Sequence, residues 1–225
     1  MTDMDGVLVH EGNIIPGADL FVKRLRETET PFLVLTNNSI YTPRDLQFRL
    51  RNTGIEVPVE SIWTSALATA TFLDQQRPGG SAYVVGEAGL TTALHEIGYV
   101  LTESAPDYVM LGETRTYSFE AVTTAIRLVE RGARFVATNP DATGPSNEGS
   151  LPATGSVAAL NRLGAHSETT VMIGDRMDTD VVAGLEAGMR TVLVLSGIMR
   201  AEGVDQYPYR PSRVVSSIAE LVDDV

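Results

Sequence analysis

The sequence predicts an α/β fold, namely a doubly wound parallel sheet into which a second α/β segment is inserted. Two observations lead to this prediction. Short apolar runs recur along the chain, and helical patterns with recognisable ends lie between them. Apolar runs of this length suit parallel strands that are buried on both faces. The runs are residues 7–9, 32–35, 83–85, 108–111, 135–137, 171–173 and 192–195.

The helices are expected from their start signals and their apolar spacing. We expect helices to begin near Pro16 and at Pro43, because proline suits the first helical position. Two further helices are expected over residues 122–129 and 181–187, where apolar residues recur every three or four positions.

The composition excludes several classes of function. The chain has 225 residues, 43% of them hydrophobic, and a formal net charge of −12 without a basic run. This charge would repel a polyanion, so we expect no nucleic-acid partner. The absence of cysteine excludes disulfides and thiolate metal sites and suits a cytoplasmic protein. We find neither a signal peptide nor a run of about 18 apolar residues, so we expect no membrane partner.

Two irregular stretches suggest a domain organisation. Residues 77–81 and 139–155 are rich in Gly, Pro, Ser and Asn, and they bracket a segment with strands and helices of its own. We therefore expect a core domain formed by residues 1–78 and 155–225, with residues 79–154 inserted as a second domain.

Polar clusters at expected strand ends are the candidate chemistry, because open α/β sheets bind ligands there. Asp3 and Asp5 are two positions apart, so both carboxylates can face one site while Met4 points away. Such a pair can provide a nucleophile and a general acid and base if a cation offsets its charge. The alternative is an ordinary acidic turn.

The other two clusters have the same ambiguity. Thr36 and Asn37 follow an apolar run and can form an anion cradle, although Asn38 can equally cap a turn. Asp175 follows another run directly, and Asp180 lies five residues later. These carboxylates suit Mg²⁺, but an acid near a helix start can be purely structural.

In this order, the three clusters resemble motifs one, two and four of the haloacid dehalogenase superfamily. Other segments resemble its NagD-like branch, also called para-nitrophenylphosphatase-like. These segments are residues 83–87, 112–115, 137–141 and 211–212. The resemblance covers nearly the whole chain. It implies a Rossmann-like core with a C2-type cap inserted after motif two, in agreement with the segment 79–154.

The resemblance implies a role for each matching core residue. Asp3 would attack phosphorus, and Asp5 would protonate the leaving alcohol and later deprotonate the attacking water. Asp3, the backbone carbonyl of Asp5 and Asp175 would hold Mg²⁺, with Asp180 supporting its water shell.

The resemblance also implies where the substrate would bind. Thr36 and the backbone of Asn37 would bind phosphate oxygens. Substrate contacts from the cap are expected at four residues: Glu113, Arg115, Tyr117 and Asn139.

The chain departs from the family in one motif. The family's third motif is a lysine on a strand before motif four, but Lys23 is the only lysine here and lies in an expected helix. A strand–helix unit of roughly 20–30 residues is missing between positions 160 and 161. Few residues also precede Asp3. Loss of a core strand would leave its neighbours unpaired, so we expect that the printed sequence omits residues; the alternative is a genuine deletion.

We therefore predict an Mg²⁺-dependent phosphatase acting through a phosphoaspartyl intermediate. Its partner would be a small phosphate monoester of the nucleotide, sugar phosphate or para-nitrophenyl phosphate type, and the family suggests a homo-oligomer. The alternative is a catalytically impaired, phosphate-binding homologue that lacks the motif-three lysine. A phosphomutase or a dehalogenase would share the fold, although Asp5 argues against a dehalogenase.

Overall fold

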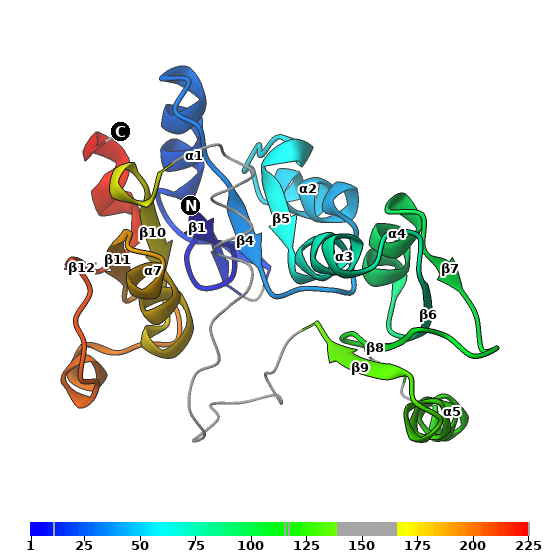
Figure 1. The fold of residues 1–225 in the computed structure, drawn as a ribbon. Helices are drawn as coiled ribbons and strands as arrows, with labels where there is room; N and C mark the ends of the chain where they lie inside the picture. The colour runs from blue at the N-terminus through cyan, green and yellow to red at the C-terminus, as the bar shows by residue number, and fades with distance from the viewer. Residues whose placement is uncertain (11, 115, 117, 139–165, 225) are drawn as a thin grey trace. The chain divides into compact units, whose positions relative to one another are not determined.

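A computed structural model describes residues 1–10, 12–114, 116, 118–138 and 166–224 (Figure 1). Backbone contacts divide the chain into two compact units, which are described separately. The first comprises Met1–Thr36, Leu46–Trp63 and Glu148–Val225, and the second comprises Asn37–Asp45 and Thr64–Asn147.

The first unit is built on a six-stranded sheet with the strand order β12-β11-β10-β1-β4-β5. Its strands are β1 (Thr2–Asp3), β4 (Val34–Thr36), β5 (Ile62–Thr64), β10 (Val171–Gly174), β11 (Arg190–Val194) and β12 (Arg213–Val215). β1 pairs in parallel with β10 on one side and with β4 on the other. The carboxyl ends of these three strands therefore lie at one edge of the sheet, as the sequence predicts.

Helices of this unit bury the apolar residues that their spacing predicts. α1 (Ala18–Glu27) buries Phe21 and Leu25 and packs against the turn η5 (Ile218–Asp224). Gly17 permits this packing, because a Cβ at that position would lie 2.4 Å from the Cβ of Ala219. α2 (Pro43–Asn52) begins at its proline, as expected.

Two predicted elements differ in the structure. Residues 7–9 do not form a strand of the sheet, because β2 (Val9–His10) pairs antiparallel with β3 (Asn13–Ile14) in a short hairpin. Val7 and Leu8 are apolar because they are fully buried in the turn before that hairpin. The helix expected over residues 181–187 is split into the π-helical turn η3 (Met177–Val181) and α7 (Val182–Glu186).

The second unit has a four-stranded parallel sheet with the order β7-β6-β8-β9. Its strands are β6 (Ser81–Val85), β7 (Val100–Leu101), β8 (Tyr108–Leu111) and β9 (Arg134–Ala137), and its helices are α3 (Ser65–Gln76), α4 (Ala88–Glu96) and α5 (Phe119–Glu130). The apolar runs at 83–85, 108–111 and 135–137 and the helix at 122–129 are thus confirmed as β6, β8, β9 and α5.

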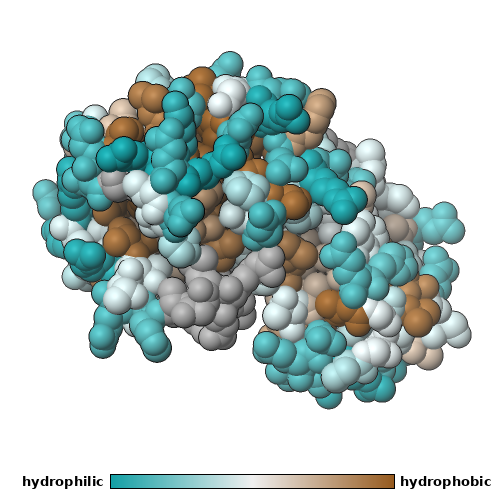
Figure 2. All heavy atoms as spheres, turned by 90° about the horizontal axis from the view of Figure 1, so that it is seen from above, coloured by the Kyte–Doolittle hydropathy of each residue, from teal (hydrophilic) through white to brown (hydrophobic). Residues whose placement is uncertain are grey.

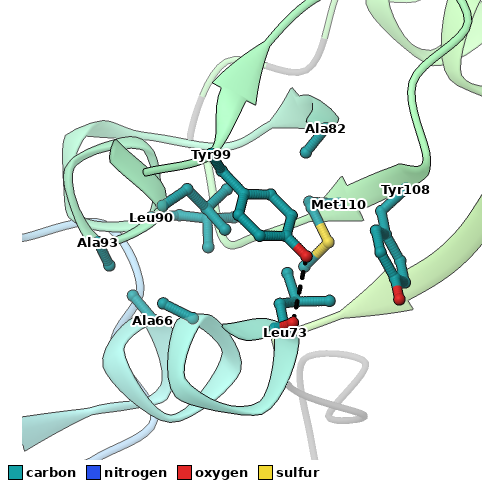
Figure 3. Packing of buried hydrophobic residues seen from close by; sticks show 10 residues of the cluster. Ala66, Leu73, Ala82, Leu90, Ala93, Tyr99, Tyr108 and Met110 are labelled. Atoms are coloured by element: carbon teal, nitrogen blue, oxygen red, sulfur yellow. Dashed lines mark hydrogen bonds between the residues drawn. The ribbon is translucent and has the colours of Figure 1, made fainter. Parts of the chain in front are cut away.

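The core of the second unit forms where α3 and α4 pack together beside the sheet (Figure 3). Leu73, Leu90 and Met110 are fully buried there. The Tyr99 ring lies among them, and its hydroxyl is within hydrogen-bond distance of the carbonyls of Leu73, at 3.2 Å, and Arg77, at 2.8 Å. Tyr99 thereby fills the core with its ring and provides a hydrogen-bond donor at the carboxyl end of α3.

The elements that the sequence analysis did not foresee are mostly short. β5, β7 and β12 have two or three residues each, too few for a strand pattern. The remaining short turns are η1 (Val59–Ser61), η2 (Ser167–Thr169) and η4 (Ala201–Gln206). The irregular stretch 139–155 lies outside the described residues. So does the junction between 160 and 161, where a segment is expected to be missing.

The interior strands of the described core sheet are paired on both sides. β10 pairs directly with both β1 and β11, and β1 pairs with both β10 and β4. The junction between 160 and 161 lies outside the described residues, so the missing strand–helix unit stays a prediction.

The surface is mainly hydrophilic where Figure 2 shows it. On the face shown in Figure 2, hydrophilic residues dominate and hydrophobic ones occur in small separate groups. Within the part of the chain that the structure describes, no helix is long and apolar enough to cross a membrane.

We predict that Tyr99→Phe lowers the free energy of unfolding by about 1 kcal/mol, because it removes the hydroxyl that lies within hydrogen-bond distance of the carbonyls of Leu73 and Arg77 at the end of α3. Urea denaturation measures the change. The matched control is Tyr83→Phe on β6 of the same unit, because the Tyr83 hydroxyl lies outside the core cluster, where it makes a long bond, 3.4 Å, to the carbonyl of Ala121 and interacts with the Thr124 side chain. Equal losses in the two variants would contradict the assigned role of Tyr99.

Candidate active site

Three carboxylates meet at the carboxyl edge of the core sheet. Asp3 is the last residue of β1, Asp175 directly follows β10, and Asp180 lies in η3. Each offers an oxygen that lies within 4.8 Å of those of the other two. They converge because β1 and β10 are parallel neighbours, with Thr2 opposite Ile173. These are hard oxygen donors, suited to a hard divalent cation.

The turn after β1 places the second aspartate of motif one. Met4 is buried in the core, whereas Asp5 is exposed on the turn. Gly6 permits the turn with φ of +82°, and its amide donates to the carbonyl of Val9 at 2.7 Å. Asp5 is not one of the three residues that share the 4.8 Å cluster, but its charge acts on Asp3.

Asp180 is fixed by the backbone of the segment that it follows. Its Oδ2 accepts hydrogen bonds from the amides of Asp175, at 3.1 Å, and Arg176, at 3.0 Å. Gly174 is required next to it, because a Cβ there would lie 2.2 Å from the Cβ of Asp180. The π-helical turn thus folds the Asp180 carboxylate back onto the end of β10.

Asp178 is the structural acid of this segment. Arg176 donates to it through Nε at 3.1 Å and Nη2 at 2.9 Å. Burial raises the pKa of Asp178, but the hydrogen bonds and charge of Arg176 outweigh that effect, so the net shift is downward. Asp178 lies inside the π-helical turn and does not cap a helix.

The motif-two residues fall on both sides of the division between the units. Thr36 is buried at the end of β4, next to β1 in the first unit. Asn37 belongs to the second unit, where its carbonyl accepts from the Ser65 hydroxyl at 2.7 Å. Asn38 caps a turn, as its alternative interpretation suggests, since its Oδ1 accepts from the amides of Ile40 and Tyr41.

Of the four predicted cap contacts, the structure describes Glu113 alone. Glu113 is exposed in the second unit, and its amide donates to the buried hydroxyl oxygen of Ser39 at 2.8 Å. The other three residues, Arg115, Tyr117 and Asn139, lie outside the described residues.

The three clustered carboxylates all resist ionisation. Burial raises the pKa of Asp3 well above its ordinary value, and the charges of Asp180, Asp175 and Asp5 raise it further. Burial and the charge of Asp175 raise the pKa of Asp180 to about 7. Burial also raises the pKa of Asp175, although the Ile198 amide partly offsets it. Three carboxylates this close together need a bound cation or shared protons at neutral pH.

Sequence reasoning missed the residues that follow β11. Ser196 and Ile198 hydrogen-bond to Gly6 and Asp175 respectively. The only sequence signal is a serine and a glycine after an apolar run, which is also an ordinary turn pattern.

Comparisons with known proteins agree with this architecture. A family model described as haloacid dehalogenase-like hydrolase matches residues 1–100, and a HAD-hydrolase-like model matches residues 152–221. The dihydroxyacetone phosphatase of Corynebacterium glutamicum is 58% identical over 99% of this chain and 90% of its own length. The ribonucleotide monophosphatase NagD of Escherichia coli is 40% identical over 97% of this chain and 96% of its own.

Solved structures show the same relationship. NagD from E. coli superposes with a TM-score of 0.90, covering 97% of this chain and 96% of its own at 40% identity. The p-nitrophenyl phosphatase from Archaeoglobus fulgidus has a TM-score of 0.87, covering 100% of this chain and 98% of its own at 31% identity.

The fold, the acidic cluster and these similarities define the class: the chain belongs to the haloacid dehalogenase-like hydrolases. Within that family it is a NagD-like phosphatase, that is, a phosphoric monoester hydrolase.

These relatives also contain residues that the chain lacks. The alignments with the two relatives named above run over 247 and 243 positions, more than the 225 residues of the chain. Since nearly the whole chain is aligned in each case, the extra positions fall within the aligned span. They are compatible in length with an absent strand–helix unit.

We predict that Asp180→Asn stabilises the metal-free protein, and more so at high pH. The pKa of Asp180 is about 7 in the folded state against an ordinary 3.8, so folded protein holds this proton more tightly and wild-type stability falls as pH rises between these values. The advantage of the variant in free energy of unfolding should grow by about 2–3 kcal/mol from pH 5 to pH 8. Urea denaturation in EDTA measures it.

The control for this prediction is Asp178→Asn. The pKa of Asp178 is lowered, so its stabilising contribution is complete at both pH values and is lost only in stronger acid. Its removal should cost the same at pH 5 and pH 8. An advantage of Asp180→Asn that does not depend on pH would contradict the burial of this charge.

Proposed function

We propose that the chain is an Mg²⁺-dependent phosphatase that hydrolyses small phosphate monoesters through a phosphoaspartyl intermediate on Asp3. The observation that carries the proposal is the convergence of Asp3, Asp175 and Asp180 within 4.8 Å at the carboxyl edge of the sheet. Thr36, at the end of the neighbouring strand, supports a phosphate site at the same edge.

In this proposal the chain's own residues carry out two displacements. An oxygen of the Asp3 carboxylate attacks phosphorus, and the bond from phosphorus to the ester oxygen breaks as Asp5 gives that oxygen a proton. Asp5 then takes a proton from water, whose oxygen attacks phosphorus, so that inorganic phosphate leaves and Asp3 is restored. The exposed position of Asp5 supports this exchange of protons.

The raised pKa values make a cation necessary for this chemistry. Asp3 must be ionised to attack, yet burial and three neighbouring carboxylates favour its protonated form. Asp3, Asp175 and the backbone carbonyl of Asp5 would hold Mg²⁺, with Asp180 supporting its water shell, and the ion would supply positive charge that offsets the carboxylates and the phosphate dianion.

Substrate selection is assigned to the inserted segment. We propose residues 79–154 as the cap, with Glu113, Arg115, Tyr117 and Asn139 as substrate contacts, and the Thr36 hydroxyl and the Asn37 amide as phosphate ligands. The relative named dihydroxyacetone phosphatase, at 58% identity, makes a three-carbon sugar phosphate the first substrate to test, ahead of nucleotides. We also propose a cytoplasmic homo-oligomer, which light scattering and cell fractionation can test.

The missing motif-three lysine favours a second candidate function, that of a catalytically impaired homologue that binds phosphate. Lys23 lies exposed on α1, 3.8 Å from Glu27, so it is a surface residue. The main influences on the pKa of Asp3 include no positive side chain of the described residues. A chain without the motif-three cation would bind Mg²⁺ and phosphate but turn over slowly or not at all.

We predict that the protein hydrolyses para-nitrophenyl phosphate and dihydroxyacetone phosphate with Mg²⁺ and not in EDTA. Asp3→Asn should abolish this activity, a loss on the order of 10³ or more, because the attacking oxygen loses its charge. Release of inorganic phosphate measures turnover. The matched control is Asp74→Asn, an exposed aspartate on α3, which should behave as the wild type. Turnover that survives Asp3→Asn would end the proposed mechanism.

The same experiment separates the two candidate functions. Wild-type chain that binds Mg²⁺ by calorimetry but releases no phosphate would establish the impaired homologue. The intact mass of the natural protein settles the missing segment, because 24.2 kDa corresponds to the printed chain. A mass about 2–3 kDa larger corresponds to an additional strand–helix unit.

A further inference from the structure

Residues 196–199, which begin two positions after the end of β11, contact both halves of the acidic site. They follow β11 at the carboxyl edge of the sheet, two strands away from β1. We refer to these four residues as the strap. Each of its contacts described below lies within the first unit.

The first contact of the strap fixes Asp175. The Ile198 amide donates to Oδ2 of the Asp175 carboxylate at 2.6 Å, and the Met199 amide donates to the Asp175 carbonyl at 3.1 Å. Side chain and backbone of one aspartate are thus held by consecutive amides. Because the side chain of Ile198 is 66% exposed, this contact depends on its backbone alone.

The second contact fixes the turn of motif one. The Ser196 hydroxyl donates to the Gly6 carbonyl at 2.8 Å. Gly6 directly follows Asp5, so the bond also restrains the backbone that carries Asp5. One short segment thereby joins the motif-one turn to the motif-four aspartate.

Close packing leaves no room for a side chain between these parts. A Cβ at Gly197 would lie 1.9 Å from Oδ2 of Asp175, and a Cβ at Gly6 would lie 2.3 Å from the same atom. Real Cβ atoms do not approach so closely, so both positions require glycine while Oδ2 of Asp175 lies between them and the Ile198 amide. A side chain at either position would force the Asp175 carboxylate to move.

The far end of the strap is anchored by apolar packing. Met199 packs against the buried cluster of Met177, Val181, Leu193 and Val204. Tyr209 belongs to the same surroundings and donates to the Met177 carbonyl at 3.0 Å, at the start of η3. The strap is therefore a fixed part of the core.

We propose that the strap is the positioning element of the cation site, with Ser196 and Gly197 setting the geometry between Asp175 and the motif-one turn. This inference rests on the proposed function, because it assigns these residues to the site that holds Mg²⁺. If the proposal is correct, the affinity for Mg²⁺ changes when the strap is altered, even where the variant folds as the wild type does. Groups that orient metal ligands commonly change metal affinity by about 10–100-fold when they are replaced.

The test compares two matched pairs of variants of the full chain. Gly197→Ala places a methyl group against Asp175. The control Gly184→Ala, on α7, places a methyl group instead against Thr191, 2.5 Å from its Cγ2, and against Met172, neither of which belongs to the strap. Ser196→Ala removes the hydroxyl that donates to the Gly6 carbonyl, whereas Ser212→Ala removes a hydroxyl that accepts from the Thr191 amide at the opposite end of β11. Mg²⁺ affinity is measured by calorimetry without substrate, beside the thermal midpoint of each metal-free protein.

We expect Gly197→Ala to weaken Mg²⁺ binding by at least about tenfold and Ser196→Ala by about three- to tenfold, with both controls within about twofold of the wild type. Strap variants that lower the thermal midpoint as Ser212→Ala does, while keeping wild-type Mg²⁺ affinity, would overturn the proposal and make the strap merely structural.

The result is distinguishable from failure of the proposed function. A wild type that binds Mg²⁺ without hydrolysing esters loses the proposed reaction, yet the affinity ratios still decide the role of the strap. If the wild type binds no Mg²⁺, the proposed function and this role in cation binding both fail. In that case a crystal structure of Gly197→Ala still shows whether the glycine fixes the Asp175 side chain.

Discussion

The mutual repulsion of Asp3, Asp175 and Asp180 is the constraint on which the site depends. Their oxygens are confined within 4.8 Å of one another on a rigid sheet edge, and burial opposes the charge of each. Such a group is stable only with bound protons or a cation. The surrounding structure supplies backbone amides and glycine-sized spaces that hold the carboxylates together despite this cost.

Much of this site could be predicted because strand ends are visible in the sequence. Thr36 and Asp175 come at the ends of apolar runs, and parallel strands bring their carboxyl ends to one edge. Asp3 follows no such run and was singled out by its spacing from Asp5 and by the family resemblance. The role of Asp180 is less visible, because a π-helical turn gives no periodic pattern.

What could not be predicted depends on contacts distant in sequence. Ser196 bonds to Gly6 across 190 positions, and neither residue type indicates its partner. The hairpin of β2 and β3 was mistaken for a core strand because a buried turn is as apolar as a strand. An apolar pattern indicates that a segment is buried, but it does not indicate which part of the protein covers that segment.

The continuity of the described core sheet has a consequence for how this family can change. β1 is hydrogen-bonded to β10 on one side and to β4 on the other, and none of these three strands includes the segment that would carry the motif-three lysine. Folding of the core and supply of a catalytic cation are therefore separable demands on the sequence. A member can lose the residue that accelerates the reaction and still retain a well-packed core, so such losses would persist as stable, ion-binding proteins and would not be removed as misfolded ones.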